Sequence, residues 1–209
     1  MLKKVGITQS LSRGHREELA RHCEIIILEE GQSLSGLLAR DELSACHGLI
    51  CLLIDPITRA VTDAMPKLEF VSSVSAGVDH IDIQALTERG VPVGHTPGVL
   101  VATTADAAFG LLLAAARRLV EGDRFIREGN WRPDNRWSPD FFLGKEVSGA
   151  TLGIIGLGAI GQAVARRAAG FDMRVIGWTP SGREVPGVDS VSLEILLSRS
   201  DFVSVHLAL

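Results

Sequence analysis

A glycine-rich turn between a strand-like and a helix-like segment constrains the fold of this chain more than any other feature. Residues 151–155 read TLGII, a short apolar run typical of a buried strand, and the turn GLGAIG follows at 156–161. The stretch 160–169 has the pattern of a helix, and Gly170 ends it. This order of strand, turn and helix predicts the opening of a parallel, doubly wound α/β sheet.

The three glycines of this turn, Gly156, Gly158 and Gly161, fit the pattern GxGxxG. In that pattern the first glycine permits a tight turn, the second lets the backbone approach a pyrophosphate, and the third allows close packing of helix on strand. The N-terminus of the helix offers unpaired N–H groups and the positive end of its dipole to phosphates. The strand and helix around the turn favour dinucleotide binding, and a purely structural turn is the alternative.

Two further strands are predicted after the glycine turn, at 173–177 and 201–205, with a short helix at 192–199 between them. We count 201–205 as the third strand of the sheet. The first half of a Rossmann fold is therefore expected, with the sequence stopping before the crossover to a fourth strand. A sheet that ended there would leave an apolar edge at 201–205, and such an edge invites pairing or aggregation.

The loop after the second of these strands bears on the choice of dinucleotide. An NAD site usually has Asp or Glu about 20 residues past the glycine motif, but here Thr179 stands at that position, followed by Pro180 and Ser181. Arg183 could bind a 2′-phosphate through a charge-assisted fork; a solvated loop residue is the alternative interpretation. These residues favour NADP(H) over NAD(H).

Residues 1–98 predict a separate domain. Strands are expected at 3–8, 24–28, 48–54, 68–73 and 91–94. Helices are expected at 12–23, 58–65 and 82–89, with a further short helix around Gly31 and Gly36. Strands that alternate with helices in this way predict a second parallel, doubly wound sheet.

The second domain is expected to span 99–209. It begins with a long predicted helix at 99–120, which is apolar nearly all round, as expected of a helix buried between two domains. A more polar helix continues at 121–129, and a loop rich in Pro, Asp, Asn and Trp follows at 130–140.

Composition excludes several classes of function. The formal net charge of −4 gives no electrostatic footprint for nucleic acid or an anionic membrane surface. The three cysteines, Cys23, Cys46 and Cys51, have neither the spacing of a zinc site nor the even number of a disulfide framework, so reduced thiols in the cytoplasm are expected. The chain shows no signal peptide, and its longest apolar block, 107–116, is too short to span a bilayer.

The segment Val74–Asp82 reads VSAGVDHID and lies between a predicted strand and a predicted helix. Its backbone N–H groups can form an anion-binding nest, and an α-keto or α-hydroxy acid carries a suitable anion. The alternative is an ordinary entry into a helix, with Asp79 as the capping residue.

Several stretches together resemble the D-2-hydroxyacid dehydrogenases, and most closely their glyoxylate/hydroxypyruvate reductase branch. The stretches are VSSVSAGVDHID, VPVGHTPGVLVATTADAAFGLLLAAARR, RFIREGNW, GATLGIIGLGAIGQAVARRAAGFDMRVIGW and DFVSVHLAL. The resemblance implies a flavodoxin-like substrate domain joined to a Rossmann cofactor domain. It also implies hydride transfer between a nicotinamide and a small 2-keto or 2-hydroxy acid such as glyoxylate or hydroxypyruvate.

The resemblance assigns site residues to both domains. Ala76, Gly77 and Val78 match the backbone that holds the substrate carboxylate, and Thr104 matches a residue of the cofactor cleft. The remaining matches concern the cofactor: Leu157, Gly158, Ala159 and Ile160 at the pyrophosphate, Thr179, Pro180 and Ser181 at the adenosine ribose, and His206 and Leu207 below the adenosine. A homodimer formed through the helix region Val99–Val120 is also implied.

The sequence departs from the family pattern at several places, among them Ala102 and Ala208, where the family frequently has Glu and Pro. His95 stands where the family usually has Asn, in a turn before Pro97 and Gly98. The Arg, Glu and His that carry the family's catalysis have no counterpart up to residue 209, so no catalytic residue is assigned. A chain truncated in this way is expected to lack turnover by itself. A non-catalytic dinucleotide-binding or scaffold protein, or a degenerate gene product, remains the alternative.

Overall fold

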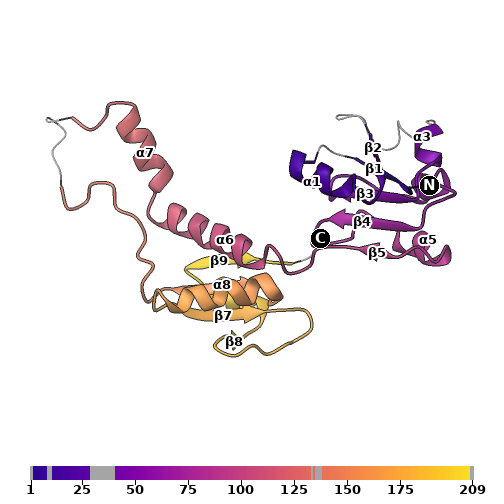
Figure 1. Ribbon diagram of the computed structural model, residues 1–209. Helices are drawn as coiled ribbons and strands as arrows, with labels where there is room; N and C mark the ends of the chain where they lie inside the picture. Colours follow the sequence, from indigo (N-terminus) through magenta and orange to yellow (C-terminus); the bar gives the residue numbers. More distant parts are fainter. Residues whose placement is uncertain (1, 9–10, 29–40, 133, 135–137, 208–209) are drawn as a thin grey trace. The chain divides into compact units, whose positions relative to one another are not determined.

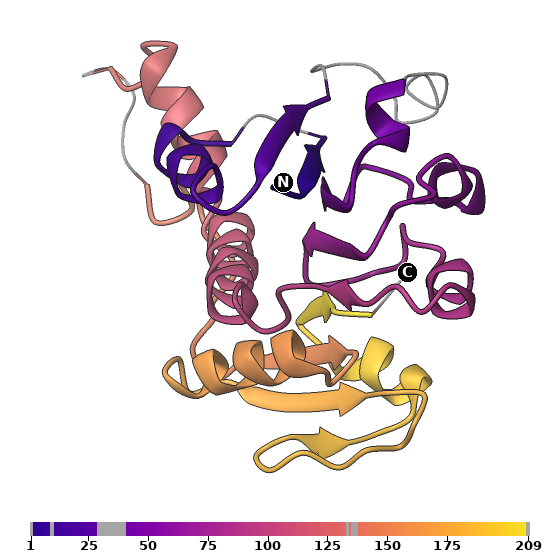
Figure 2. The same cartoon turned by 45° about the vertical axis from the view of Figure 1, so that its right-hand side comes forward.

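The computed structural model describes residues 2–8, 11–28, 41–132, 134 and 138–207. The chain divides into two compact units, Met1–Val99 and Leu100–Leu209 (Figures 1 and 2). This division lies one residue after the boundary that the sequence suggests. Each unit is built around its own parallel sheet and hydrophobic core.

The sheet of the first unit has five parallel strands. They are β1 (Lys4–Ile7), β2 (Glu24–Ile27), β3 (Gly48–Leu52), β4 (Phe70–Val74) and β5 (Val93–Gly94). Their order across the sheet, β2-β1-β3-β4-β5, is the flavodoxin order, so the predicted fold class of this unit is confirmed. Leu49 and Val71 are completely buried in its core, because the strands of a parallel sheet are covered on both faces.

Four short helices are described in the first unit. They are α1 (Arg13–Leu19), α3 (Asp41–Ser44), α4 (Arg59–Asp63) and α5 (Ile83–Glu88). Ser12 caps α1, since its hydroxyl accepts a hydrogen bond from the backbone N–H of His15. The short helix predicted around Gly31 and Gly36 lies outside the described residues.

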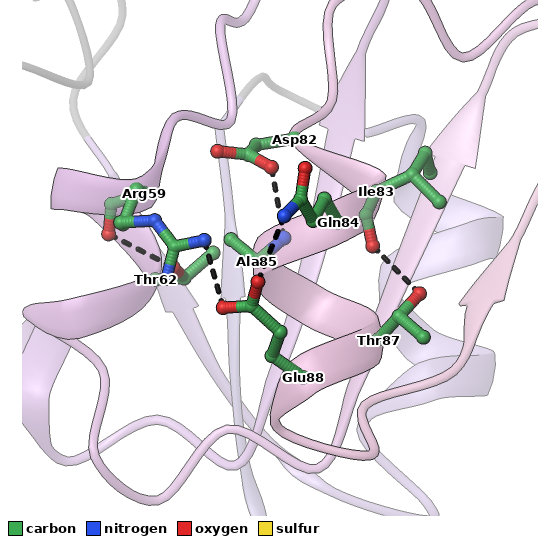
Figure 3. Close-up of polar contacts among 8 residues, drawn as sticks. All are labelled: Arg59, Thr62, Asp82, Ile83, Gln84, Ala85, Thr87 and Glu88. Atoms are coloured by element: carbon green, nitrogen blue, oxygen red, sulfur yellow. Dashed lines mark hydrogen bonds and ion pairs between the residues drawn. The ribbon is translucent and has the colours of Figure 1, made fainter.

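Polar contacts tie α4 to α5 (Figure 3). Arg59 Nη2 donates to the Glu88 carboxylate at 2.8 Å, and Gln84 Nε2 donates to the same carboxylate at 3.0 Å. The Asp82 carboxylate accepts a hydrogen bond from the N–H of Ala85 and so caps the start of α5. The Asp82 cap fixes the beginning of α5, and therefore the end of the loop that connects it to β4, whereas the Glu88 contacts hold the other end of the helix.

The second unit begins with two helices, α6 (Val101–Ala116) and α7 (Leu119–Arg127). The prediction of one helix at 99–120 is wrong, because Arg118 adopts a left-handed conformation with φ of 53° and breaks the helix there. The expectation of a fully buried helix is also wrong within this chain. Ala105 and Phe109 are buried, but the side chain of Leu111 is 72% exposed.

The sheet of the second unit contains β6 (Thr151–Ile155), β7 (Arg174–Trp178), β8 (Asp189–Ser190) and β9 (Phe202–Val205). Their order is β8-β7-β6-β9, and all neighbours are parallel. This corresponds to places 3-2-1-4 of a Rossmann sheet, so the Rossmann fold class is confirmed. The prediction of 201–205 as the third strand is wrong, because the two-residue strand β8 takes the third place and β9 takes the fourth. The structure therefore includes the crossover that we expected to be missing.

Two helices cover opposite faces of this sheet. A Cβ added at Gly153 would meet Leu196 and Ser200, at α9 (Leu193–Arg199), whereas the next residue, Ile154, approaches Gly161 in α8 (Ala159–Ala169). Because successive residues of a strand point to opposite faces, α8 and α9 lie on different sides of β6. Helix α6 packs against α8, and the pair is visible in Figure 2.

Two kinds of feature are absent from the described part of the chain. None of its helices is long and apolar enough to cross a membrane. The same residues hold no group of three or more His, Cys, Asp and Glu side chains that could bind a metal ion.

Candidate functional site

The glycine turn connects β6 to α8, and its first glycine adopts a conformation that other residues rarely adopt. Gly156 has φ of 98°, and a Cβ at this position would lie 2.3 Å from the carbonyl oxygen of His206. The N–H of Gly156 donates to the carbonyl of Trp178 at 2.8 Å. Gly156 therefore permits a sharp turn that remains in contact with the ends of β7 and β9.

The other two glycines differ in what surrounds them. A Cβ at Gly161 would lie 2.1 Å from the carbonyl oxygen of Gly156, so the close contact between α8 and the turn requires glycine there. A Cβ at Gly158 would meet nothing within 4 Å. Gly158 is exposed at the cap of α8 and leaves open space beside the backbone, where a ligand can approach.

The start of α8 offers its backbone to that space. In the part of the chain that the structure describes, the N–H groups of Gly158, Ala159 and Ile160 donate to no acceptor. The side chain of Leu157 is buried against Gly177, so only the backbone of Leu157 is available to a ligand. This arrangement of free N–H groups at a helix N-terminus is suited to an anion such as a pyrophosphate.

His206 and Leu207 lie next to the glycine turn. A Cβ at Gly156 would lie 3.0 Å from the side chain of Leu207, and His206 donates its N–H to the carbonyl of Ile155 at 2.7 Å. The His206 ring contacts the Ser204 hydroxyl at 2.8 Å, and burial lowers the pKa of this imidazole. Burial therefore favours the neutral form of His206 beside the turn.

The residues that bear on the adenosine ribose follow β7. Thr179 is half-buried, Pro180 and Ser181 are exposed, and the hydroxyl oxygens of Thr179 and Ser181 lie 3.4 Å apart. Arg183 is exposed, and its guanidinium has no partner among the residues that the structure describes. Hydroxyl groups and a free guanidinium thus stand in this loop, and no carboxylate occupies position 179.

Thr104 is separate from this group of contacts. It lies in the first turn of α6, where its N–H donates to the carbonyl of Leu100 at 2.8 Å, and its side chain is exposed. Within the described residues, no hydrogen bond joins Thr104 to the glycine turn. Helix α6 is instead held to α8 by Arg167, which donates to the Asp106 carboxylate at 2.6 Å and to the carbonyl of Ala102 at 3.0 Å.

In the first unit, the loop Ser75–Val78 follows β4, and each of its four carbonyl oxygens accepts a hydrogen bond. The carbonyl of Ser75 accepts from the N–H and hydroxyl of Thr96, at 2.8 and 3.1 Å. The carbonyl of Ala76 is bonded to His95 Nδ1 at 3.0 Å. The carbonyl of Gly77 accepts from the Ser75 hydroxyl at 2.6 Å, and that of Val78 accepts from the N–H of Ile81 at 2.9 Å.

The N–H groups of the same loop are free. Among the residues that the structure describes, the N–H groups of Ala76, Gly77 and Val78 donate to no acceptor, and Ala76 and Gly77 are exposed. The alternative of Asp79 as a helix cap is wrong, because Asp82 caps α5. The loop thus presents a row of unpaired donors, which is the property of an anion-binding nest.

Sequence reasoning did not find the side chains that support this loop. Ser73 and Ser75 are buried below it, with their hydroxyl oxygens 2.6 Å apart, and His80 Nε2 lies 3.0 Å from Ser73 Oγ. The one available signal was the run of polar residues in VSSVS, which is unusual at the end of a buried strand. His95 and Thr96 approach from a different strand end, and no sequence spacing connects them to the loop.

Comparison with known proteins gives consistent matches for both units. Residues 109–209 match the family model described as D-isomer specific 2-hydroxyacid dehydrogenase, NAD binding domain. A glyoxylate reductase from Korarchaeum cryptofilum is 44% identical over the whole chain, which covers 64% of that protein.

Two solved structures extend the comparison. A protein from Thermus thermophilus is 39% identical with a TM-score of 0.89, over 99% of this chain and 65% of that one. An acyclic imino acid reductase, solved in complex with NADPH and D-Arg, is 25% identical with a TM-score of 0.82, over 99% of this chain and 66% of that one.

The chain spans just under two thirds of the length of these relatives. The matches nevertheless extend over both units, including the glycine turn and the loop after β4. The chain belongs to the family of D-isomer specific 2-hydroxyacid dehydrogenases.

Proposed function

We propose that this chain contains the substrate-binding and cofactor-binding parts of an NADP(H)-dependent oxidoreductase for small 2-keto and 2-hydroxy acids such as glyoxylate or hydroxypyruvate. One observation carries the proposal: each unit presents a row of free backbone N–H groups at a turn between a parallel strand and a helix. Two anionic partners, a dinucleotide and a carboxylate, fit these two turns.

The residues of the second unit fit a dinucleotide. Gly158 leaves open space for a pyrophosphate, and the N–H groups of Ala159 and Ile160 are free to bind it. His206 and Leu207 would lie below the adenosine, next to Gly156. A bound nicotinamide would supply the hydride chemistry, and the protein's part is to hold and orient the reactants.

The loop after β7 supports a preference for NADP(H). A carboxylate at position 179 would repel a 2′-phosphate, and Thr179 does not. Ser181 and Arg183 are exposed in the same loop and can donate to phosphate oxygens. The similar imino acid reductase whose structure contains NADPH is in agreement with this preference.

The loop Ser75–Val78 is proposed to bind the substrate carboxylate. Its N–H groups at Ala76, Gly77 and Val78 would donate to the carboxylate oxygens, which fixes the position of the neighbouring carbonyl carbon for hydride transfer. The name of the Korarchaeum relative, glyoxylate reductase, agrees with a small 2-keto acid as substrate.

We further propose a cytoplasmic homodimer that uses the region Val99–Val120. Leu111, Leu119 and Val120 expose apolar side chains on α6 and α7, and a second copy of the chain could cover them. Analytical ultracentrifugation of the chain and of a Leu111→Glu variant tests this assembly. A monomeric wild-type chain would exclude it.

Binding measurements on the 209-residue chain test the proposed function. We expect NADPH to bind more tightly than NADH, and we expect Arg183→Ala to reduce this preference while the affinity for NADH stays the same. Arg166→Ala, which removes another arginine of the same unit, is the matched control. Equal affinities for the two dinucleotides in the wild-type chain would contradict the proposed preference, and no binding of either would contradict the proposed function.

A further inference from the structure

The number of protons that each group can donate determines which atoms carry the protons around the loop Ser75–Val78. The carbonyl of Gly77 can only accept, so the Ser75 hydroxyl donates its single proton to it. Ser75 Oγ must then accept from Ser73 Oγ, 2.6 Å away, which uses the single proton of Ser73. Ser73 Oγ must in turn accept from His80 Nε2 at 3.0 Å. The chain of donors therefore begins at an Nε2–H of His80 and ends at the carbonyl of Gly77.

The same reasoning applies to the second histidine beside the loop. The carbonyl of Ala76 can only accept, so His95 must carry its proton on Nδ1, 3.0 Å away. As neutral imidazoles, the two histidines therefore hold opposite tautomers, with the proton on Nε2 in His80 and on Nδ1 in His95. Asp79, which lies close to Gly77, takes no part in either chain of donors.

These contacts determine where the free N–H groups point. In a trans peptide the carbonyl of one residue and the N–H of the next lie in one plane and point in opposite directions. His95 holds the Ala76 carbonyl and so directs the N–H of Gly77 away from itself. The donor chain from His80 holds the Gly77 carbonyl and so directs the N–H of Val78.

We propose that His80 and His95 are positioning residues, which orient the N–H groups of Gly77 and Val78 toward a bound carboxylate by donating from opposite ring nitrogens. Neither histidine needs to touch the substrate for this role. The inference rests on the proposed function of the loop as the carboxylate site. It assigns a specific role to side chains from two different segments, one after β4 and one after β5.

Replacing each of the two histidines by Asn and, separately, by Gln tests the proposal. The amide nitrogen of Asn occupies the position of a histidine Nδ1, and that of Gln approximates the position of Nε2. We therefore expect His95→Asn and His80→Gln to bind oxamate within about twofold of the wild-type chain. We expect His95→Gln and His80→Asn to bind it about threefold to tenfold more weakly, since the first loses the hydrogen bond to the Ala76 carbonyl and the second loses the hydrogen bond to Ser73 Oγ.

Oxamate affinity is to be measured on the 209-residue chain from the amide resonances of Ala76, Gly77 and Val78, and the remaining amide spectrum shows whether each variant is folded. If oxamate shifts none of these resonances in the wild-type chain, the carboxylate site and the role of the histidines are both overturned. If the wild-type chain binds and all four variants bind equally well, the carboxylate site stands and the positioning role is overturned.

The ring nitrogens provide a second measurement that needs neither a ligand nor a variant. Long-range proton–nitrogen correlation spectra distinguish the two tautomers of a neutral histidine. We expect Nε2–H for His80 and Nδ1–H for His95. The opposite tautomer at either residue would overturn the proposal for that residue.

Discussion

Replacing single glycines of the turn by alanine separates its structural role from its ligand-binding role. In Gly161→Ala the new methyl carbon would lie 2.1 Å from the carbonyl oxygen of Gly156 and 3.3 Å from the side chain of Ile154. Both the turn and α8 present backbone at this contact, so no flexible side chain can move aside. The two segments must separate by about 1 Å to reach an ordinary contact distance, which is the situation of an overpacked core.

The expected loss of stability follows from two opposing contributions. Overpacking of this kind costs about 1–3 kcal/mol, and the backbone contact places Gly161→Ala near the upper end. Alanine in place of glycine inside a helix returns about 0.5–1 kcal/mol. We therefore expect Gly161→Ala to lower the free energy of unfolding of the second unit by about 2 kcal/mol.

Gly158→Ala is the matched control. A methyl group there meets nothing within 4 Å, and the φ of −69° is accessible to alanine. Alanine is a poorer helix cap than glycine, so a loss below about 1 kcal/mol is expected. The methyl group would nevertheless occupy the open space beside the backbone, so we expect Gly158→Ala to weaken NADPH binding at least about tenfold.

Tryptophan fluorescence during urea unfolding measures these effects in the second unit alone. All three tryptophans, Trp131, Trp137 and Trp178, lie after residue 99. With a urea dependence of about 2 kcal/mol per molar, Gly161→Ala should lower the unfolding midpoint by about 1 M and Gly158→Ala by less than half of that. Equal midpoints for the two variants would refute the assignment of separate roles to the two glycines.

Three further predictions concern other parts of the chain. Burial raises the pKa of the Cys51 thiol to about 11. At pH 8 the fraction of reactive thiolate is therefore about 100-fold below that of a thiol with a pKa of 9.0. An aromatic disulfide reagent should modify Cys51 only after the chain is unfolded in urea. Arg167→Ala should destabilise the second unit by about 1–2 kcal/mol in the fluorescence assay, since hydrogen bonds from α8 to α6 are lost, whereas the neighbouring Arg166→Ala should have no measurable effect. Val205 is 62% exposed on β9, which pairs only with β6 among the described strands. Val205→Lys should therefore reduce concentration-dependent light scattering of the chain. Unchanged scattering would exclude this edge as the site of self-association.

The glycine turn could be predicted from the sequence because its geometry requires particular residue types. Gly156 needs a positive φ, and Gly161 needs the absence of a side chain, so both requirements are visible as letters at fixed spacing. The flavodoxin-like and Rossmann fold classes follow from the alternation of strands and helices in the same way. Two-residue strands leave no such signal, and overlooking β8 led to the wrong place for β9 in the sheet.

The break between α6 and α7 could not be predicted from hydrophobicity. Residues 99–120 remain largely apolar on both sides of the break. The left-handed residue is Arg118, and arginine is not a residue type that is enriched in this conformation. The geometry is stabilised by contacts outside the helix. Arg118 Nη1 donates to the carbonyl of Leu143, and its guanidinium lies 4.4 Å from the centre of the Phe142 ring. Contacts between residues 25 positions apart decided the outcome at this point.

Of the two candidate binding turns, one can be recognised from its sequence and the other cannot. Both are proposed to bind through backbone N–H groups, which every residue except proline provides, so the ligand itself would place little demand on side-chain type. At the glycine turn the demand is for glycine at both ends of a stretch of six residues, because a Cβ would meet backbone oxygen at both Gly156 and Gly161. At the loop Ser75–Val78 it comes from donors at positions 73, 80, 95 and 96, which together hold its carbonyls in place. Loss of the donor at position 73, 80 or 95 would leave the loop sequence intact and still change the direction of its N–H groups, so the loop sequence alone is insufficient to predict carboxylate binding.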